Sequence, residues 1–399
     1  MQSDSPRHAL VIGAGLAGAA VCSVLASKGW RLTLLDAGSG PAQAASALPV
    51  GMLSPHVTRA PTPLSRLSAL GVADTRTELE RLIPQGQGWQ ACEVDNLSHD
   101  VGRWPAALVR PAALVHAWLD EASRLAQLTA HWNHEVAQLW RVQPGIDAEG
   151  GGPATPTATW RAVAADGSTL AEAPMVVVCA AFGSASLLSG TGVALPTNAL
   201  PLRPVKGQMS LAELSGEALA DWPQRDNGVY VPQYEDSGLA PRWPSRIWAM
   251  GSTYVRGDAS TDVTDDGHQR NAQSLEAMNP QAAERLRESA GSQRLLGWAE
   301  VRCASLDRLP LAGAVPDNSA LLQLKGTRRR YLPSLADTPR EPGLYMLSAL
   351  GSRGITLAHW CARLIASQIQ GESFDADPDL VAAVDPARFA WRQARRSST

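Results

Sequence analysis

A glycine-rich turn near the N-terminus constrains this chain more than any other feature of its sequence. The residues HALVIGAGLAG (8–18) predict a buried strand that runs into the pattern G-x-G-x-x-G. In such a turn Gly13 allows the tight bend, Gly15 lets backbone N–H groups approach a pyrophosphate, and Gly18 lets a helix pack closely on the strand. The turn therefore predicts a dinucleotide site.

The residues after the turn complete a βαβ unit. We expect a helix over 16–28 with Gly29 as its C-cap, and a second strand over 30–35. Asp36 follows that strand, where it can accept hydrogen bonds from the ribose hydroxyls of an adenosine. The uncharged stretch 9–27 approaches the length of a membrane span, but its glycines and the strand after it favour the βαβ unit. The motif by itself does not separate NAD from FAD.

Composition bounds the size and the partners of the protein. The 399 residues, 45% of them hydrophobic, can bury a large core and suggest two domains. The net charge of −3 excludes a strongly basic surface overall, yet two basic clusters near the C-terminus fit either a solvated surface or an RNA contact. These clusters are Arg328, Arg329 and Arg330, and then Arg392, Arg395 and Arg396.

Several classes of site are excluded by the sequence. The five cysteines have no CxxC spacing, which predicts neither a disulfide framework nor a zinc site, and no His/Glu cluster has metal spacing. The chain also lacks a G-x-S-x-G elbow and a Walker loop. With no signal peptide expected ahead of the first strand, these features favour a cytoplasmic protein.

The middle of the chain favours FAD over NAD. A small-residue segment (41–55) follows the βαβ unit, and a helix (111–126) and a strand (134–142) come later. The Gly/Pro/Thr-rich stretch 144–158 is interpreted as a hairpin tip, because strand-like residues resume after it and end in APMVVVCAA (173–181). This order is similar to the three-stranded meander that FAD proteins insert before a buried parallel strand.

An arginine lies at a predicted helix N-terminus near the C-terminal end. An apolar run (343–349) predicts a strand, and LAHWCARLIASQIQ (357–370) predicts a helix that stops at Gly371. Arg353 lies in the joint LGSRGIT (350–356) between them. A helix N-terminus already carries partial positive charge and favours anions, so a bound anion would explain this arginine.

Together these motifs resemble the D-amino-acid-oxidase/glycine-oxidase superfamily of FAD-dependent amine oxidoreductases over nearly the whole chain. The resemblance implies an α/β fold, with a Rossmann-like FAD domain that carries a three-stranded meander and a substrate domain built on an antiparallel sheet. The matching motifs are VIGAGLAG, AASALPVGML, LRPVKGQ (202–208), GVYVP (228–232) and the LGSRG block. We expect the FAD domain at 1–58, 105–203 and 340–399, and the substrate domain at 59–104 and 204–339.

Three blocks, 251–271, 299–317 and 343–372, are similar to the oxidoreductase half of the bifunctional enzymes that make 5-methylaminomethyl-2-thiouridine in tRNA. The resemblance implies oxidation of a 5-carboxymethylaminomethyl-uridine at the wobble position, with release of glyoxylate. Because the chain starts at the FAD strand, we expect the methyltransferase step of that family to come from a separate protein or to be absent. Two alternatives stay open: a stand-alone oxidase of free glycine, sarcosine or a D-amino acid, and a tRNA-binding partner of a separate methyltransferase that keeps FAD only structurally.

The implied substrate carries a carboxylate, which arginine can bind through two parallel hydrogen bonds. The resemblance assigns this role to Arg302 and to Arg353, the latter beside the flavin. The alternatives are an ion pair of Arg302 with Asp307 or Glu300, and capping of backbone carbonyls by Arg353.

Three further residues are candidates for the active site. Tyr254 and Tyr230 are expected as wall or lid residues and Lys206 as a residue that reaches toward the flavin, with packing roles open for each. Some sarcosine-oxidase relatives attach their flavin through a cysteine seven residues before the motif aspartate. Counted from Asp307, that position holds Glu300, so we predict noncovalent FAD.

The resemblance also implies which residues contact FAD, and Ala181 among them stands where the family usually has glycine. These residues are Gly13, Ala14, Gly15, Leu16, Ala17, Gly18, Asp36, Ala37, Ala45, Ser46, Gly51, Met52, Val136, Cys179, Ala180, Ala181, Gly351, Ser352, Arg353, Gly354, Ile355 and Thr356.

Overall fold

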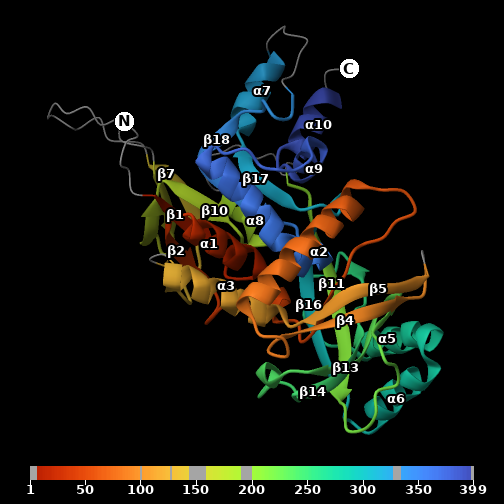
Figure 1. Cartoon of the computed structure of the whole chain (residues 1–399). Coiled ribbons are helices and arrows are strands. Elements are labelled where there is room, and N and C mark those ends of the chain that lie inside the picture. Colours follow the sequence, from red (N-terminus) through yellow and green to blue (C-terminus); the bar gives the residue numbers. More distant parts are fainter. Residues whose placement is uncertain are drawn as a thin grey trace, which may run out of the picture.

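Two large sheets and one small sheet, covered by helices, make up the architecture (Figure 1). The computed structural model describes residues 7–98, 101–125, 128–142, 159–189, 200–326 and 334–396. The predicted hairpin tip at 144–158 and the cluster Arg328 to Arg330 lie outside the described residues. Parallel strands joined by helices confirm the predicted α/β class.

The first sheet is mainly parallel and holds the predicted βαβ unit. Its strand order is β17-β18-β10-β1-β2-β6, and β17 runs antiparallel to β18. Ala9 and Val11 of β1 pack into one core cluster while Leu10 and Ile12 pack into another, so both faces of the sheet are buried. The strands are β1 (His8–Ile12), β2 (Arg31–Leu35), β6 (Leu128–His131), β10 (Met175–Val178), β17 (Leu311–Pro316) and β18 (Arg340–Ser348).

Helices cover one face of the first sheet and a small sheet covers the other (Figure 1). The helices are α1 (Leu16–Ser27), α2 (Pro63–Leu82), α3 (Pro111–Leu125) and α8 (Gly354–Gln370). The predicted helices at 16–28 and 111–126 are therefore confirmed as α1 and α3. The small antiparallel sheet is the expected meander, with strands β7 (Gln138–Val142), β8 (Thr159–Val163) and β9 (Thr169–Ala173), and the short α4 (Gly183–Ser189) lies on the same side.

The second sheet has nine strands and curves strongly. Leu108 of β5 and Trp298 of β16 meet in one core cluster, although their strands lie toward opposite ends of the hydrogen-bonded order. Helices α5 (Asp265–Met278) and α6 (Pro280–Gly291) pack on the other face. The strands are β3 (Gly51–Leu53), β4 (Trp89–Asn96), β5 (Gly102–Val109), β11 (Leu202–Glu213), β12 (Gln224–Asp226), β13 (Gly228–Glu235), β14 (Arg246–Gly251), β15 (Val255–Arg256) and β16 (Leu296–Ser305).

Strand pairing departs from the expected domain ranges at several places. β3 and the last part of β5 fall in ranges expected for the FAD domain, yet they pair with each other in the second sheet. β17 falls in a range expected for the substrate domain, yet it pairs with β18 in the first sheet. α2 likewise lies against α8, where the Thr75 hydroxyl donates to the Ile355 carbonyl at 2.9 Å. Such crossings between layers depend on tertiary pairing, which the local pattern of a segment does not encode.

The remaining helices lie near the C-terminus: α7 (Asn318–Gly326), α9 (Pro378–Val384) and α10 (Arg388–Arg396). Arg392 and Arg395 of the second predicted basic cluster lie on α10, and the side chain of Arg396 is outside the described part. Of the helices described, none is long and apolar enough to cross a membrane.

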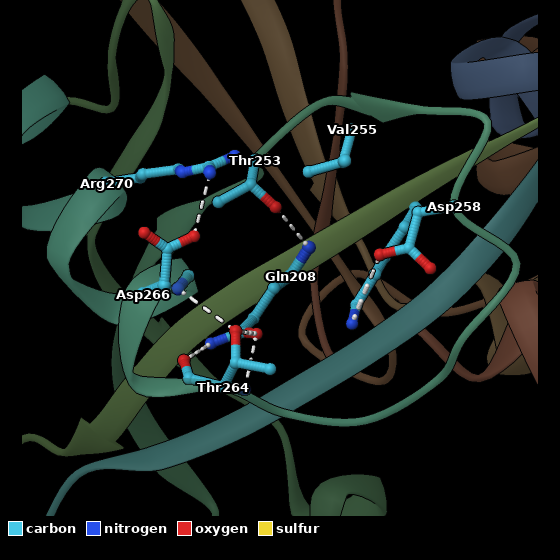
Figure 2. A pocket seen from close by; sticks show the side chains of 9 residues that line it. Gln208, Thr253, Val255, Asp258, Thr264, Asp266 and Arg270 are labelled. Carbon is cyan, nitrogen blue, oxygen red and sulfur yellow. Dashed lines mark hydrogen bonds and ion pairs between the residues drawn. The ribbon is translucent and has the colours of Figure 1, made fainter.

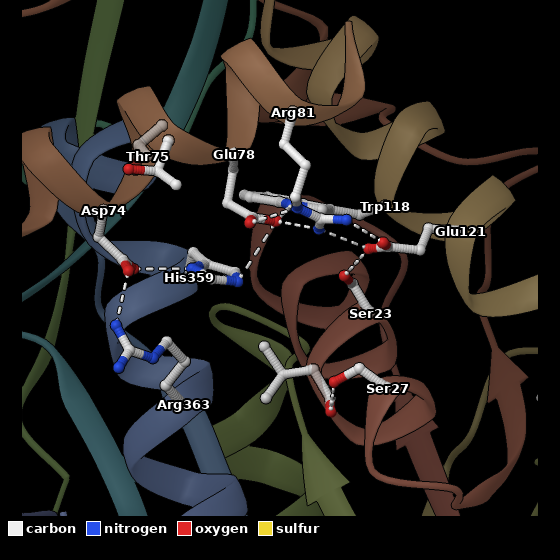
Figure 3. A network of polar contacts seen from close by, with 12 residues as sticks. Ser23, Ser27, Asp74, Thr75, Glu78, Arg81, Trp118, Glu121, His359 and Arg363 are labelled. Carbon is white, nitrogen blue, oxygen red and sulfur yellow. Dashed lines mark hydrogen bonds and ion pairs between the residues drawn. The ribbon is translucent and has the colours of Figure 1, made fainter. Parts of the chain in front are cut away.

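A network of charged side chains joins the helices over the first sheet (Figure 3). Arg81 on α2 donates to Glu78 on the same helix and to Glu121 on α3. Ser23 on α1 donates to Glu121 at 2.7 Å, so three helices meet at one guanidinium. Glu78 and Glu121 are both less than 10% exposed, and a charge so buried is tolerated only when it is paired.

His359 extends the network to α8. Its Nδ1 lies 2.7 Å from Asp74 Oδ2 and its Nε2 lies 3.4 Å from Glu78 Oε2, while Arg363 donates to Asp74 at 2.7 Å. Burial alone would raise the pKa of Asp74, but the hydrogen bonds from His359 and Arg363 outweigh it and lower that pKa. The hydrogen bonds from Arg81 lower the pKa of Glu121 in the same way.

Removal of Arg81 should destabilise the fold. Arg81→Met leaves two buried carboxylates without their main partner, and we expect the free energy of unfolding in urea at pH 7 to fall by about 2 kcal/mol. Because the folded pKa of Glu121 is lowered, the stability supplied by this pair is present at neutral pH and is lost as the pH falls below about 4. The difference between wild type and variant should therefore shrink in acid.

Arg161→Met is the matched control, since the Arg161–Glu172 pair is about 40% exposed on both sides. Exposed pairs contribute little, so this variant should stay within about 0.5 kcal/mol of wild type. Equal losses for the two variants would contradict the role assigned to the network.

Candidate functional site

The glycine-rich turn forms a cradle in which added side chains would collide. Gly13 has φ +106°, and a Cβ added there would lie 2.6 Å from the carbonyl oxygen of Cys179. A Cβ on Gly18 would collide with the carbonyl oxygen of Gly13, so α1 packs directly on the turn. Gly15 is the N-cap of α1 and is extended. This arrangement presents a helix N-terminus without side-chain bulk, which fits a dinucleotide pyrophosphate.

Asp36 and Ser46 border the cradle. Asp36 Oδ2 accepts from the backbone N–H of Ala14 at 2.6 Å, and Oδ1 accepts from Gly38 at 2.7 Å. Ser46, in the short helix η1 (Ala44–Ala47), accepts from the N–H of Leu16 at 3.1 Å. The residues present therefore fit an adenosine diphosphate moiety, with Asp36 at the ribose position.

The other residues implied to contact FAD gather mainly where strands of the first sheet end. Cys179, Ala180 and Ala181 follow β10, and the segment 351–356 follows β18 as the short helix η3 (Gly351–Arg353) and the first turn of α8. Ala37 follows β2, Ala45 lies in η1, Gly51 and Met52 lie in β3, and the buried Val136 precedes β7. Whether each touches FAD stays a prediction.

The second sheet separates the predicted catalytic residues onto two faces. β11 and β16 are antiparallel, with Val205 opposite Arg302 and Lys206 opposite Val301. Successive side chains point to opposite faces, so Arg302 lies on one face and Lys206 on the other. We call these the Arg302 face, which also carries Val205, Gly207 and Met209, and the α5 face, which also carries Gln208, Ser210 and Tyr230.

Arg302 is largely buried and has no carboxylate partner within the described ranges. Its guanidinium lies over Gly207, where an added Cβ would collide with it, and it donates to the Ser252 hydroxyl and to the Thr253 carbonyl at 3.4 Å. The Tyr254 ring lies 5.9 Å away and is 48% exposed. Burial lowers the pKa of Arg302, and Tyr254 acts in the opposite direction.

Neither alternative partner, Asp307 or Glu300, forms an ion pair with Arg302 within the described ranges. Asp307 binds Arg388 at 2.8 Å, and the pKa of Glu300 is raised by burial rather than held down by Arg302. Arg353 ends η3 just before α8, and no side-chain hydrogen bond or ion pair of it is found among the described residues. It therefore does not cap backbone carbonyls there. Burial and then the charge of Arg308 lower the pKa of Arg353, against the effect of Tyr254.

Lys206 and Tyr230 lie on the α5 face, opposite the face that carries Arg302. Lys206 is 5% exposed on the α5 face, donates to Ser260 at 2.8 Å and lies 3.7 Å from Asp258. It lines a pocket of about 230 Å³ beside the start of α5, together with Gln208 and Thr253 (Figure 2). Tyr230 is fully buried in the core under α5 and α6. Strand alternation directs both side chains away from Arg302, which motif matching alone did not reveal.

Sequence reasoning missed a histidine and two arginines near Arg353. Burial lowers the pKa of His56, and the charges of Arg353, Arg225 and Arg308 lower it further. Arg225 donates to Ser54 at 2.7 Å and to the carbonyl of Pro55 at 3.2 Å, directly beside His56. No motif marks Arg225, but Arg308 adjoins the aspartate of a recognised block and could have been noticed there. The site is thus rich in positive charge.

A family model matches most of the chain. The model described as FAD dependent oxidoreductase matches residues 8–122 and 102–368. Among curated relatives, two named "tRNA 5-methylaminomethyl-2-thiouridine biosynthesis bifunctional protein MnmC" are similar to this chain. The protein of Paracidovorax citrulli is 34% identical over 97% of the chain and 61% of its own length, and that of Cupriavidus necator is 33% identical over 98% and 62%. The chain therefore spans about three fifths of the length of these relatives.

Solved structures share the fold. Glycine oxidase from Geobacillus kaustophilus superposes with a TM-score of 0.64 at 17% identity, covering 95% of this chain and 98% of that one. Iminodiacetate oxidase from Chelativorans sp. BNC1 gives a TM-score of 0.61 at 19% identity, covering 92% and 97%. At such identities the likeness extends to the fold alone.

Ala181 should be a site of backbone strain. Its φ is +47°, a left-handed conformation that costs a residue with a Cβ about 1 kcal/mol. Ala181→Gly should therefore raise the free energy of unfolding by up to about 1 kcal/mol, as measured by urea denaturation. Ala180→Gly is the control, because Ala180 has no positive φ and glycine there only adds freedom to the unfolded chain. A gain in both variants, or in neither, would argue against strain at Ala181.

Proposed function

The chain belongs to the FAD dependent oxidoreductase family, and on that basis we propose that it oxidises a 5-carboxymethylaminomethyl-uridine at the tRNA wobble position and releases glyoxylate. The observation that carries the proposal is the buried guanidinium of Arg302, which lies against Gly207 and Tyr254 without a carboxylate partner among the residues described. A buried arginine of this kind is suited to bind a carboxylate of the substrate.

The proposed substrate has a nitrogen that carries a CH₂–COO⁻ group. FAD, when bound, would accept the hydride lost from that carbon, which carries the two electrons of the oxidation. Loss of the amine proton leaves a C=N bond, and addition of water splits it into aminomethyl-uridine and glyoxylate. The water oxygen becomes the aldehyde oxygen, so atoms and electrons balance.

The residues of this chain would bind and orient the substrate. Arg302 and Arg353 would hold the carboxylate from two elements, β16 and η3, which contact each other where Ala304 bridges Leu350. Fixing the carboxylate at two points orients the adjoining C–H bond, which is the main contribution a protein makes to such a reaction. The exposed ring of Tyr254 would border the entrance beside Arg302. The guanidinium of Arg353 would also favour the negative charge that a reduced flavin gathers.

The RNA part of the proposal comes from the relatives, whose printed name refers to the biosynthesis of a modified uridine in tRNA. Those relatives are called bifunctional, so the expected separate methyltransferase finds no support among them. A tRNA substrate would place the activity in the cytoplasm.

Nucleoside mass spectrometry of tRNA treated with the purified protein tests the proposal. We expect carboxymethylaminomethyl-uridine to disappear and aminomethyl-uridine to accumulate. Arg302→Leu should lower turnover by about 100-fold or more, because a buried charge-assisted pair is lost, and Arg353→Leu should keep FAD but lose most turnover.

Lys206→Met is the matched control, since this cation lies on the α5 face and should leave turnover within about threefold of wild type. Unchanged carboxymethylaminomethyl-uridine, with hydrogen peroxide formed from glycine or sarcosine, would identify a free amino-acid oxidase instead. Turnover that survives in Arg302→Leu would remove the carboxylate role from this arginine.

A further inference from the structure

A tight turn beside the candidate site is held in place by the C-terminal helix. The turn, 305–309, follows β16, and Asp307 Oδ1 in it accepts from the Ser305 hydroxyl at 3.0 Å and from the Leu309 N–H at 3.3 Å. Arg388 of α10 is 1% exposed and binds both carboxylate oxygens of Asp307, at 2.8 and 3.0 Å. A bidentate pair of this kind fixes geometry as well as charge, so the turn is rigid.

Arg308 projects from this turn. Its φ is +64°, which is uncommon for a residue other than glycine, and such strain points to a functional reason for the side chain. The side chain is exposed and has no hydrogen-bond or ion-pair partner within the portion of the chain described. Its charge nonetheless reaches Arg353 and His56 and contributes, after burial, to lowering the pKa of each. Arg308 therefore lies on the outer side of the buried cations.

Exposed arginines continue from the turn along α10. Arg392 is 51% exposed and lies 3.4 Å from Asp307, whose carboxylate Arg388 already binds. Arg395 stacks on Trp391 with 4.8 Å between the guanidinium carbon and the ring centroid. The Asp307 carboxylate thus faces two guanidiniums, those of Arg388 and Arg392, and the surface from the turn to α10 carries excess positive charge.

We propose that Arg308 binds a backbone phosphate of the RNA at the mouth of the site, and that Arg392 and Arg395 continue this contact along α10. The inference rests on the proposed function, which supplies the polyanion. A base that reacts in a buried site is turned out of its stack while its phosphates stay outside. Arg302 and Arg353 would bind the carboxylate inside, so Arg308 is left for a backbone phosphate, which the RNA carries and the free nucleoside lacks.

Arg308→Gly tests the inference without disturbing the turn, because glycine adopts φ +64° at no steric cost. We expect binding of an anticodon stem-loop RNA, measured by fluorescence anisotropy from 50 to 200 mM KCl, to weaken about fivefold or more. The slope of log affinity against log salt should fall in magnitude by about 0.7, the value for one phosphate contact with single-stranded RNA. Turnover of the free carboxymethylaminomethyl-uridine nucleoside, which has no phosphate, should stay within about twofold of wild type.

Two variants serve as controls. Arg308→Lys keeps the charge and should retain most of the RNA affinity. Arg141→Ala removes an exposed arginine of β7 whose charge acts on Glu341, at the start of β18, whereas Arg353 follows the end of that strand. It should leave RNA affinity and salt slope unchanged.

The outcomes separate the inference from the proposed function. Equal affinity and salt slope for wild type and Arg308→Gly overturn the inference, whether or not wild type converts the wobble uridine. Loss of RNA binding in Arg308→Gly, with tRNA nucleosides left unchanged by wild type, supports the inference and overturns the proposed reaction. Wild type that does not bind the stem-loop at all overturns both.

Discussion

The rest of the structure depends on the close approach of α1 to the turn that follows β1. Because Gly18 has no side chain, the first turn of α1 lies against the carbonyl of Gly13. Gly13 in turn lies against the carbonyl of Cys179, just after β10. This contact sets the height of α1 over the first sheet. α3 and α8 then pack beside α1, and Arg353 precedes α8. The position of a candidate catalytic arginine is thus linked to a glycine more than 330 residues earlier in the chain.

Positive charge gathers where the two large sheets meet. Arg302 comes from the second sheet, Arg353 from the end of the first, and Arg308 from the turn between them. Each of these guanidiniums lacks a carboxylate partner among the residues that the structure covers, whereas Arg81 and Arg388 elsewhere are fully paired. The contrast distinguishes arginines that stabilise the fold from arginines that we propose as ligands of an anionic group.

The sequence predicted the elements whose pattern is local. The βαβ unit, α3 and the joint at Arg353 follow from periodicity, glycine positions and helix stop signals, and FAD follows from the family resemblance. The strand pairing of β3 and β17 could not be predicted from the sequence, since it depends on partners far away in the chain. The sequence did not show on which face of the second sheet Lys206 and Tyr230 lie, because a motif gives the residues without the strand register. A register shift of one residue moves a side chain to the opposite face.

The strand order of the first sheet has a consequence for synthesis of the protein. β10 pairs with β1 on one side and with β18 on the other, although β18 ends at Ser348. At a translation rate of about 5–20 residues per second, the edge of β10 stays without its second neighbour for roughly 10–30 s. The growing chain therefore exposes an apolar strand edge while the segments that form the second sheet are made, and such an edge is a place where unfinished chains aggregate.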